Sequence, residues 1–229
     1  MVRNTAVIPL RDNIATHTKP IITACIVFVN ILIFAWMRLA LTGPEGQAVY
    51  RYYGLVPGEL ASSLSTRWDL APYNVLTVFS SMFLHGGVIH LVGNMLYLWI
   101  FGNNVEDAMG HKRFIVFYLL AGIVATLFQF LYDPSSNIPM IGASGAVSGI
   151  LGAYLVLFPY ARIKTLLFII IFIKIVEIPA LVLLTIWFFM QIIYLGHGGV
   201  AWYAHIGGFV FGLVTVKLFS RRSSGKARA

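Results

Sequence analysis

Apolar runs of about 17 to 25 residues, each long enough to cross the hydrocarbon core of a bilayer, recur along most of this chain. Of its 229 residues, 59% are hydrophobic and only 10% are charged. Because a chain inside lipid must satisfy its backbone hydrogen bonds internally, such runs fold as helices. The sequence therefore predicts an all-α polytopic membrane protein with one domain. The predicted spans cover residues 20–42, 85–102, 114–132, 142–158, 179–195 and 200–219.

Pro179 marks the predicted start of the fifth span. The apolar signal at 163–195 is too long for one upright crossing, and Lys174, Glu177 and Pro179 interrupt it. We place the span after the proline and the part before it at the membrane interface, where an ion pair between Lys174 and Glu177 is the default expectation.

Six spans put both termini on one side, and the charges indicate which side. Lys and Arg concentrate in the N-terminal segment, in the second-to-third and fourth-to-fifth connections and in the tail. The positive-inside rule then predicts cytoplasmic termini. The domain plan is a cytoplasmic segment over 1–19, a six-helix membrane domain over 20–219 and a basic cytoplasmic tail over 220–229. We expect an interfacial loop of about 35 to 40 residues after the first span, a turn over 103–113 and no removable signal peptide.

The composition also argues against several classes of function. A net charge of +8 suggests nucleic acid in a soluble protein, but in a membrane protein Lys and Arg clusters set topology or touch anionic lipid. The single Cys25 offers no disulfide within the chain, and His85, His90 and His205 have no carboxylate or thiol nearby that would complete a zinc site. We expect no nucleic-acid partner, no metal and no cofactor.

A hydroxyl among small residues opens the fourth span. Ser144 is followed by Gly145, Gly149 and Gly152 at helical spacing, so a helix here can approach a neighbour closely. One interpretation is a helix-packing face alone. The other is a nucleophile, and it gains support from two further spans.

Three polar residues from alternate spans are predicted at similar depth. At about 1.5 Å per helical residue, Ser144, His205 and His90 lie roughly 7 to 9 Å below the outer ends of their spans. Ionisable groups at such depth usually face an interior or aqueous cavity. A Ser144 nucleophile with His205 as base is one reading of the pair, and a structural histidine is the alternative. Acidic residues lie on the cytoplasmic side or in outer loops, so we predict a Ser–His dyad.

His90 and Asn94 lie at i and i+4 on one helical face. With the backbone N–H of Ser144 at a helix N-terminus, they are candidate donors to the oxyanion of a tetrahedral intermediate. The alternatives are a structural hydrogen-bonded pair and an intramembrane ion or proton site.

These residues together resemble the rhomboid family of intramembrane serine proteases. The resemblance rests on His90-x-x-x-Asn94, on Gly142-Ala-Ser144-Gly145 and on Ala204-His205-x-x-Gly208-x-x-x-Gly212, in this order over residues 20–219. It implies a six-helix bundle with a short central fourth helix under a cavity open to the outside. It also implies that Ser144 attacks, that His205 is the base and that His90, Asn94 and the Ser144 amide hold the oxyanion.

Two positions depart from this resemblance. Some members have a Trp-Arg pair where Leu76-Thr77 stands here, and some stack a Tyr against the histidine where this chain has Ser148. What positions His205 is thus left open, with Trp187 as a candidate. Glu106 matches an acidic residue of the family, for which we expect a helix-capping or loop-tying role.

The expected function is hydrolysis of peptide bonds in or near transmembrane segments of other membrane proteins. The expected partners are such substrates and membrane lipid, in a cell (inner) membrane, with the active site opening to the extracytoplasmic side. The main alternative is a non-catalytic rhomboid-like protein or chaperone that binds membrane helices. A channel or transporter is third, because no paired repeats or buried acidic relay are visible. The sequence predicts neither a natural substrate nor an oligomeric state.

Overall fold

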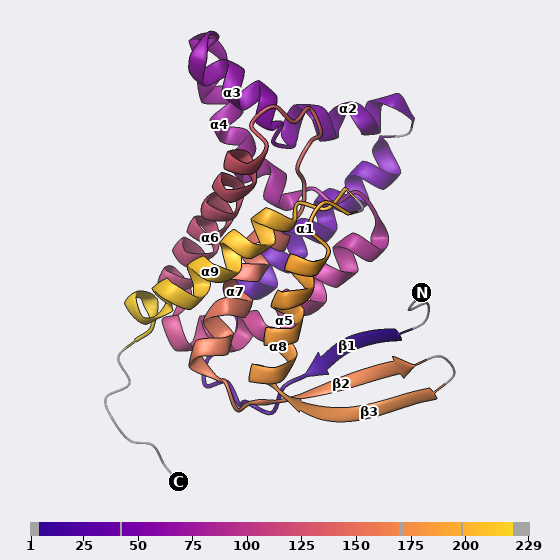
Figure 1. Cartoon of the computed structure of the whole chain (residues 1–229), viewed down its shortest axis with the longest axis vertical. Coiled ribbons are helices and arrows are strands. Elements are labelled where there is room, and N and C mark those ends of the chain that lie inside the picture. The colour runs from indigo at the N-terminus through magenta and orange to yellow at the C-terminus, as the bar shows by residue number, and fades with distance from the viewer. Residues whose placement is uncertain (1–4, 42, 170–171, 198, 222–229) are drawn as a thin grey trace.

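The computed structural model describes residues 5–41, 43–169, 172–197 and 199–221 and is mostly helical (Figure 1), whereas an all-α protein was predicted. The predicted basic tail falls largely on 222–229, outside the described residues. The longer helices are α1 (Ile21–Ala40), α5 (Val88–Met109), α6 (His111–Tyr132), α7 (Ser144–Leu157), α8 (Ala180–Ile193) and α9 (Trp202–Phe219). The connection after α1 holds α2 (Pro44–Tyr53), α3 (Pro57–Ser65), η1 (Trp68–Leu70), α4 (Ala71–Ser80) and η2 (Ser81–Phe83).

That connection was expected to be a loop and is instead largely helical. Pro occupies the first or second position of α2, α3 and α4, where its missing N–H has no helical partner to lose. In Figure 1 α2 and α3 form the upper end of the molecule, away from the strands. The sequence analysis did not predict these short helices, since they carry no long apolar run.

The predicted turn at 103–113 was wrong. α5 continues to Met109, and the break falls at Gly110, whose positive φ of 78° suits glycine. Polar residues extend the helix because their side chains bind the N-terminal segment. Asp107 accepts hydrogen bonds from the backbone N–H groups of His17 and Thr18 at 3.0 and 2.9 Å.

Glu106 caps the first helix. Its side chain is fully buried and accepts hydrogen bonds from the backbone N–H groups of Ile22 and Thr23 at 2.9 and 2.8 Å, and from the Thr23 hydroxyl at 2.7 Å. A carboxylate at a helix N-terminus also meets the favourable end of the helix dipole. These contacts agree with the capping role expected for Glu106.

Replacement of Glu106 by alanine is therefore expected to lower the free energy of unfolding by about 3 kcal/mol, because it leaves several donors at the start of α1 without their charged acceptor. Thermal unfolding in detergent would measure the change. The control is Glu59→Ala, which removes an exposed ion pair with Arg51 and should cost less than about 1 kcal/mol. Equal effects of the two substitutions would contradict the capping role.

Three strands form an antiparallel sheet that the sequence analysis did not predict. β1 (Thr5–Arg11) pairs with β2 (Arg162–Ile169), which pairs with β3 (Phe172–Pro179). Figure 1 shows the sheet at the lower end of the molecule, below α7 and α8. The segment 163–178 is rich in Ile, Val and Phe, which favour strands, and its apolar character alone does not distinguish a strand from a helix. Its placement at a membrane interface stays a prediction.

The expected ion pair between Lys174 and Glu177 was also wrong. The two residues are three apart on one strand, so their side chains leave opposite faces of the sheet. Glu177 instead lies opposite Lys164 in β2, with 3.8 Å between Lys164 Nζ and Glu177 Oε1. The division of the long apolar run at Pro179 agrees with the structure, since β3 ends and α8 begins there.

By length and composition, α1, α6 and α9 can each cross a membrane. A fourth candidate is the pair formed by residues 68–83 and α5, which is bent by 83°. α7 and α8 are apolar but have only 14 residues each, about 21 Å of helix against a hydrocarbon core of about 30 Å. The structure thus supports a membrane protein with three to four candidate spans, and a count of six stays a prediction.

The short α7 forms the centre of the bundle. Every residue from 146 to 154 is buried, and α7 packs against α5, α6, α8 and α9. Its closest neighbour is α9, because glycines of each helix contact the backbone of the other. A Cβ added at Gly208 would overlap the carbonyl oxygen of Gly145, and one at Gly212 would overlap that of Gly149. The close approach of these two spans was predicted from the same glycines.

Candidate active site

Ser144 is the first residue of α7, and the loop before it is held in place from outside the helix. The N–H of Gly142 donates to the carbonyl of Ser81 at 2.9 Å, and Met140 and Leu55 exchange two backbone hydrogen bonds. The residue at 142 has a φ of 119°, a conformation that favours glycine. The helical connection after α1 therefore fixes the chain that presents Ser144.

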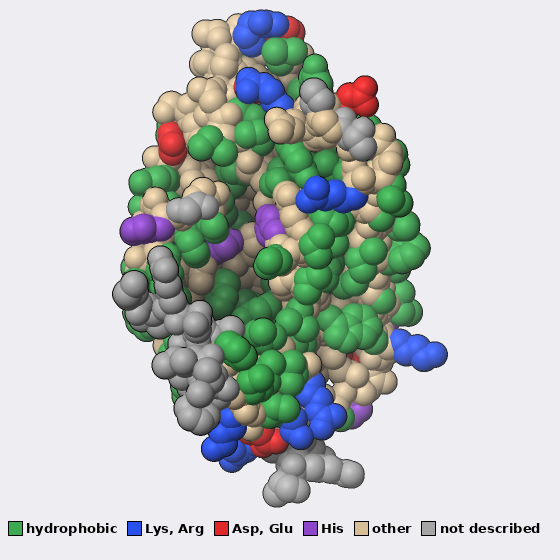
Figure 2. All heavy atoms as spheres, turned by 90° about the vertical axis from the view of Figure 1, so that its right-hand side faces the viewer, with side chains coloured by type: hydrophobic (Ala, Val, Ile, Leu, Met, Phe, Trp, Pro, Cys, Tyr) green, Lys and Arg blue, Asp and Glu red, His purple; other side chains and the backbone are tan. Residues whose placement is uncertain are grey.

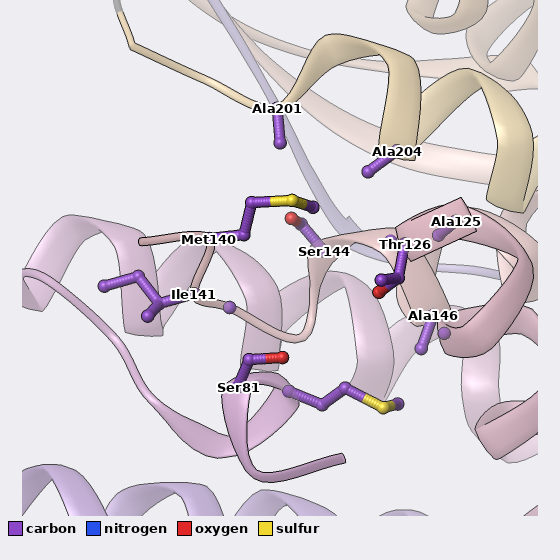
Figure 3. Close-up of a pocket in the computed structure, with 13 residues that line it drawn as sticks. Ser81, Ala125, Thr126, Met140, Ile141, Ser144, Ala146, Ala201 and Ala204 are labelled. Carbon is purple, nitrogen blue, oxygen red and sulfur yellow. The ribbon is translucent and has the colours of Figure 1, made fainter. Parts of the chain in front are cut away.

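A small cavity adjoins the Ser144 hydroxyl. Its volume is about 30 Å³, enough to hold a water molecule. Figure 3 shows the Ser144 side chain at the start of α7, with Ser81 on one side, Thr126 of α6 beside it, and Ala204 of α9 and Ala201, just before that helix, opposite. The cavity thus joins the serine to the start of the helix that carries His205.

His205 lies in the first turn of α9 and is 9% exposed. Gly145, in the first turn of α7, contacts Gly208 in the second turn of α9 and faces Ala204 in its first turn. In the part of the chain that the structure describes, the hydrogen bonds of His205 do not include one to the Ser144 hydroxyl. The structure thus brings the two helix starts together without a direct bond between the two side chains.

The ring of His205 is held by α8. Its Nδ1 lies 2.8 Å from Oε1 of Gln191, and its ring centroid lies 6.2 Å from that of Trp187. Trp187 is therefore a neighbour, as suggested from the sequence, but the hydrogen bond comes from Gln191, which sequence reasoning missed. The available signal was a lone amide in an otherwise apolar span. Ser148 donates to the carbonyl of Ser144 at 2.7 Å and so bonds within its own helix.

His90 and Asn94 lie in the first two turns of α5. A Cβ added at Gly142 would come within 2.7 Å of Nε2 of His90 and 3.7 Å of Oγ of Ser144, so imidazole and hydroxyl flank the same glycine. Asn94 is 7% exposed, and its Nδ2 donates to the carbonyl of His90 at 3.0 Å. The structure therefore brings His90 close to Ser144, whereas the observed contact of Asn94 is with its own helix.

His85 precedes α5 and packs against His90 in its first turn. The two rings meet edge to face with centroids 5.0 Å apart, and His85 is fully buried. Tyr50 donates to the backbone carbonyl of His85 at 3.0 Å, which ties this turn to α2. These contacts give His85 a structural role beside His90.

The surface around this region is largely apolar. Figure 2 shows histidine side chains in a hollow near the middle of a face covered mainly by hydrophobic side chains. Several Lys and Arg side chains gather at the lower end of the same view. Lys, Arg, Asp and Glu side chains also lie at the upper end, and an apolar band between charged ends is the distribution expected of a protein surrounded by lipid.

Comparison with known proteins identifies the family. Residues 72–222, about two thirds of the chain, match the model of the Rhomboid domain. The chain belongs to the rhomboid family. The family resemblance seen in the three sequence motifs is thereby confirmed.

Three curated relatives illustrate how far this rhomboid's similarity extends. "Rhomboid protein 1, mitochondrial" of Saccharomyces cerevisiae is 29% identical over 157 residues, which are 67% of this chain and 41% of that protein. "Rhomboid protease GluP" of Bacillus subtilis is 46% identical over 72 residues, 31% of this chain and 14% of the relative. "RHOMBOID-like protein 4" of Arabidopsis thaliana is 38% identical over 142 residues, 60% and 32% of the two chains. The rhomboid chain thus spans less than half the length of each.

Proposed function

We propose that this rhomboid is an intramembrane serine endopeptidase that hydrolyses peptide bonds in or near transmembrane segments of membrane proteins. The observation that carries the proposal is the glycine contact that brings the start of α7, with Ser144, against the start of α9, with His205. The name of one relative, a rhomboid protease, adds support. The substrates of this chain would be transmembrane helices of other proteins.

The proposed reaction uses Ser144 and His205 as a dyad. Nε2 of His205 takes the hydroxyl proton as Ser144 Oγ attacks the carbonyl carbon, and the imidazolium returns that proton to the leaving amine. A water molecule then hydrolyses the acyl-enzyme with His205 again as the base. The cavity beside Ser144 has room for such a molecule.

The oxyanion would be held by donors around the start of α7. The N–H of Ser144 belongs to the unpaired first turn of a helix, where the dipole favours negative charge. His90 approaches the same glycine, Gly142, as the Ser144 hydroxyl and would be a side-chain donor. Asn94 would join it through a second amide hydrogen, because its Nδ2 carries two and the carbonyl of His90 takes one.

A proposal of six crossings with cytoplasmic termini gains support from backbone contacts between distant segments. Two segments joined by hydrogen bonds, whether between backbones or from a backbone to a short side chain such as that of Asp107, lie on the same side of a bilayer, so the chain between them crosses an even number of times. β1 pairs with β2, Asp107 binds the N–H groups of 17 and 18, and the N–H of Arg221 donates to the carbonyl of Ala108 at 2.9 Å.

These contacts bear on whether the two short helices, α7 and α8, cross the membrane. If α6 crosses between Ala108 and β2, then α7 must cross as well, and if α9 crosses between β3 and Arg221, then so must α8. Six crossings follow when α1 and α5 are added. The Lys and Arg residues at the sheet end favour the cytoplasm there, so Ser144 would open toward the extracytoplasmic side of a cell (inner) membrane.

Labelling with a fluorophosphonate tests the proposed function. The detergent-solubilised native protein is expected to form a covalent adduct at Ser144, and Ser144→Ala and His205→Ala are each expected to lose it, since one lacks the nucleophile and the other its base. Intact mass spectrometry with peptide mapping would locate the adduct. Ser63→Ala, a buried serine of α3, is the control and should keep full labelling.

Persistence of the adduct in Ser144→Ala would contradict the assignment of the nucleophile. A folded native protein that neither labels nor cleaves a model transmembrane substrate would favour the alternative of a non-catalytic protein that binds membrane helices.

A further inference from the structure

Gln191 makes a hydrogen bond to Nδ1 of His205. It belongs to α8, whereas His205 belongs to α9, so the contact joins two spans. Gln191 is 6% exposed and His205 is 9% exposed. A hydrogen bond between buried groups is costly to leave unmade, so this contact constrains both side chains.

A second hydrogen bond fixes which end of the Gln191 amide faces the imidazole. Nε2 of Gln191 donates to the carbonyl of Trp187 at 2.8 Å, one turn earlier in α8. Because a carbonyl can only accept, the amide nitrogen must face Trp187 and the amide oxygen must face His205. The hydrogen-bond network therefore assigns a proton to Nδ1 of His205 and leaves Nε2 as its basic nitrogen.

Aromatic packing holds this turn of α8 against α9. The rings of Phe188 and Phe209 stack with centroids 4.7 Å apart, and Trp187 lies 5.8 Å from Phe209. Trp202 meets the His205 ring edge to face at 5.8 Å. The Gln191 amide is thus held by a tightly packed helix. A group that orients another side chain needs such rigid support.

We propose that Gln191 is the positioning residue of the dyad: its amide oxygen fixes the Nδ1–H tautomer and the orientation of His205. This inference rests on the proposed function of Ser144 and His205. In serine proteases with a triad, a buried aspartate holds the histidine in this way. Here an uncharged amide does so, which avoids placing a carboxylate among membrane-spanning helices, where charge is expensive.

Two substitutions distinguish the effect of the hydrogen-bond acceptor of Gln191 from the effect of its side-chain volume. Gln191→Leu keeps a similar shape but removes the acceptor, and we expect about a hundredfold fall in kcat with little change in KM, because tautomer and orientation affect the chemical step. Gln191→Glu, in its neutral form, supplies an oxygen acceptor for Nδ1–H and a hydroxyl donor for the Trp187 carbonyl, and it is expected to recover most of that loss. Gln129→Leu, at a half-buried amide of α6, is the control and should retain native kinetics.

The tautomer is measured directly by nitrogen NMR of protein labelled with ¹⁵N-histidine, without any substrate. The signal that disappears in His205→Ala identifies His205. We expect the Nδ1–H form in the native protein and a mixture of both forms in Gln191→Leu.

An unchanged His205 signal in Gln191→Leu, or equal losses of kcat in Gln191→Leu and Gln191→Glu, would overturn the positioning role. Failure of the proposed function looks different, because the tautomer would respond to Gln191 as expected while the native protein cleaved nothing.

Discussion

Ser144→Ala and His205→Ala are each expected to abolish cleavage of a model transmembrane substrate, with a fall in kcat of at least about ten-thousandfold. The first removes the oxygen that attacks the carbonyl carbon, and the second removes the group that takes its proton and returns it to the leaving amine. Because the two act as a unit, the double substitution should cost about as much as either alone. The measurement is cleavage of a fluorescent transmembrane peptide in proteoliposomes.

Binding distinguishes this outcome from unfolding. Ser144→Ala removes one hydroxyl at the edge of a small cavity, so the variant should still capture the uncleaved substrate and should unfold at the native temperature. Cleavage at the native rate by either variant would overturn the dyad. Capture without cleavage by the native protein itself would favour the chaperone-like alternative.

Gly208→Ala is expected to reduce kcat/KM by about a hundredfold or more, although it adds a single methyl group. The new Cβ would overlap the carbonyl oxygen of Gly145 and press toward the N–H of Gly149, so the obstacle is backbone that cannot rotate away. α9 must then move from α7, and a displacement of about 1 Å at reacting groups can cost about a hundredfold. Overpacking should also lower the free energy of unfolding by about 1 to 3 kcal/mol.

The matched control is Gly93→Ala in α5. The same methyl group meets no atom within 4 Å there, and alanine favours the helix over glycine by about 1 kcal/mol. This variant should be at least as stable as the native protein and equally active. Parallel thermal unfolding and cleavage assays compare the two. Native activity of Gly208→Ala would show that the helix starts need not be so close.

The long helices were predictable because each carries its own signal. α1, α6 and α9 are apolar over the length of a bilayer, and Pro179 marks the start of α8. The sheet was missed because Ile, Val and Phe at 163–178 suit both a strand and an apolar helix, and its partner β1 lies at the other end of the sequence. Local patterns do not show which distant segment supplies the hydrogen bonds.

In the candidate site, too, the residues that carry their own signal in the sequence were predictable. Ser144, His205 and His90 were found because each is polar within an apolar span, and the glycines around them predicted the contact of α7 and α9. Gln191 was missed because its role depends on the orientation of an amide between two helices, which spacing along one helix does not reveal. The backbone hydrogen bonds between Met140 and Leu55 also join distant segments, so the local sequence did not predict them.

The pairing of β1 with β2 has a consequence for the order in which the molecule is completed. A ribosome releases β1 first, but its partner emerges only after α1, α5, α6 and α7 have been made. During that time the strand has unpaired backbone groups and must stay out of other pairings. The capping of α1 by Glu106 can form earlier, once α5 is complete. Closure of the sheet thus becomes possible only after α7 has been made and before α8 and α9 follow, so it fastens the first strand to a helical body that still lacks two helices.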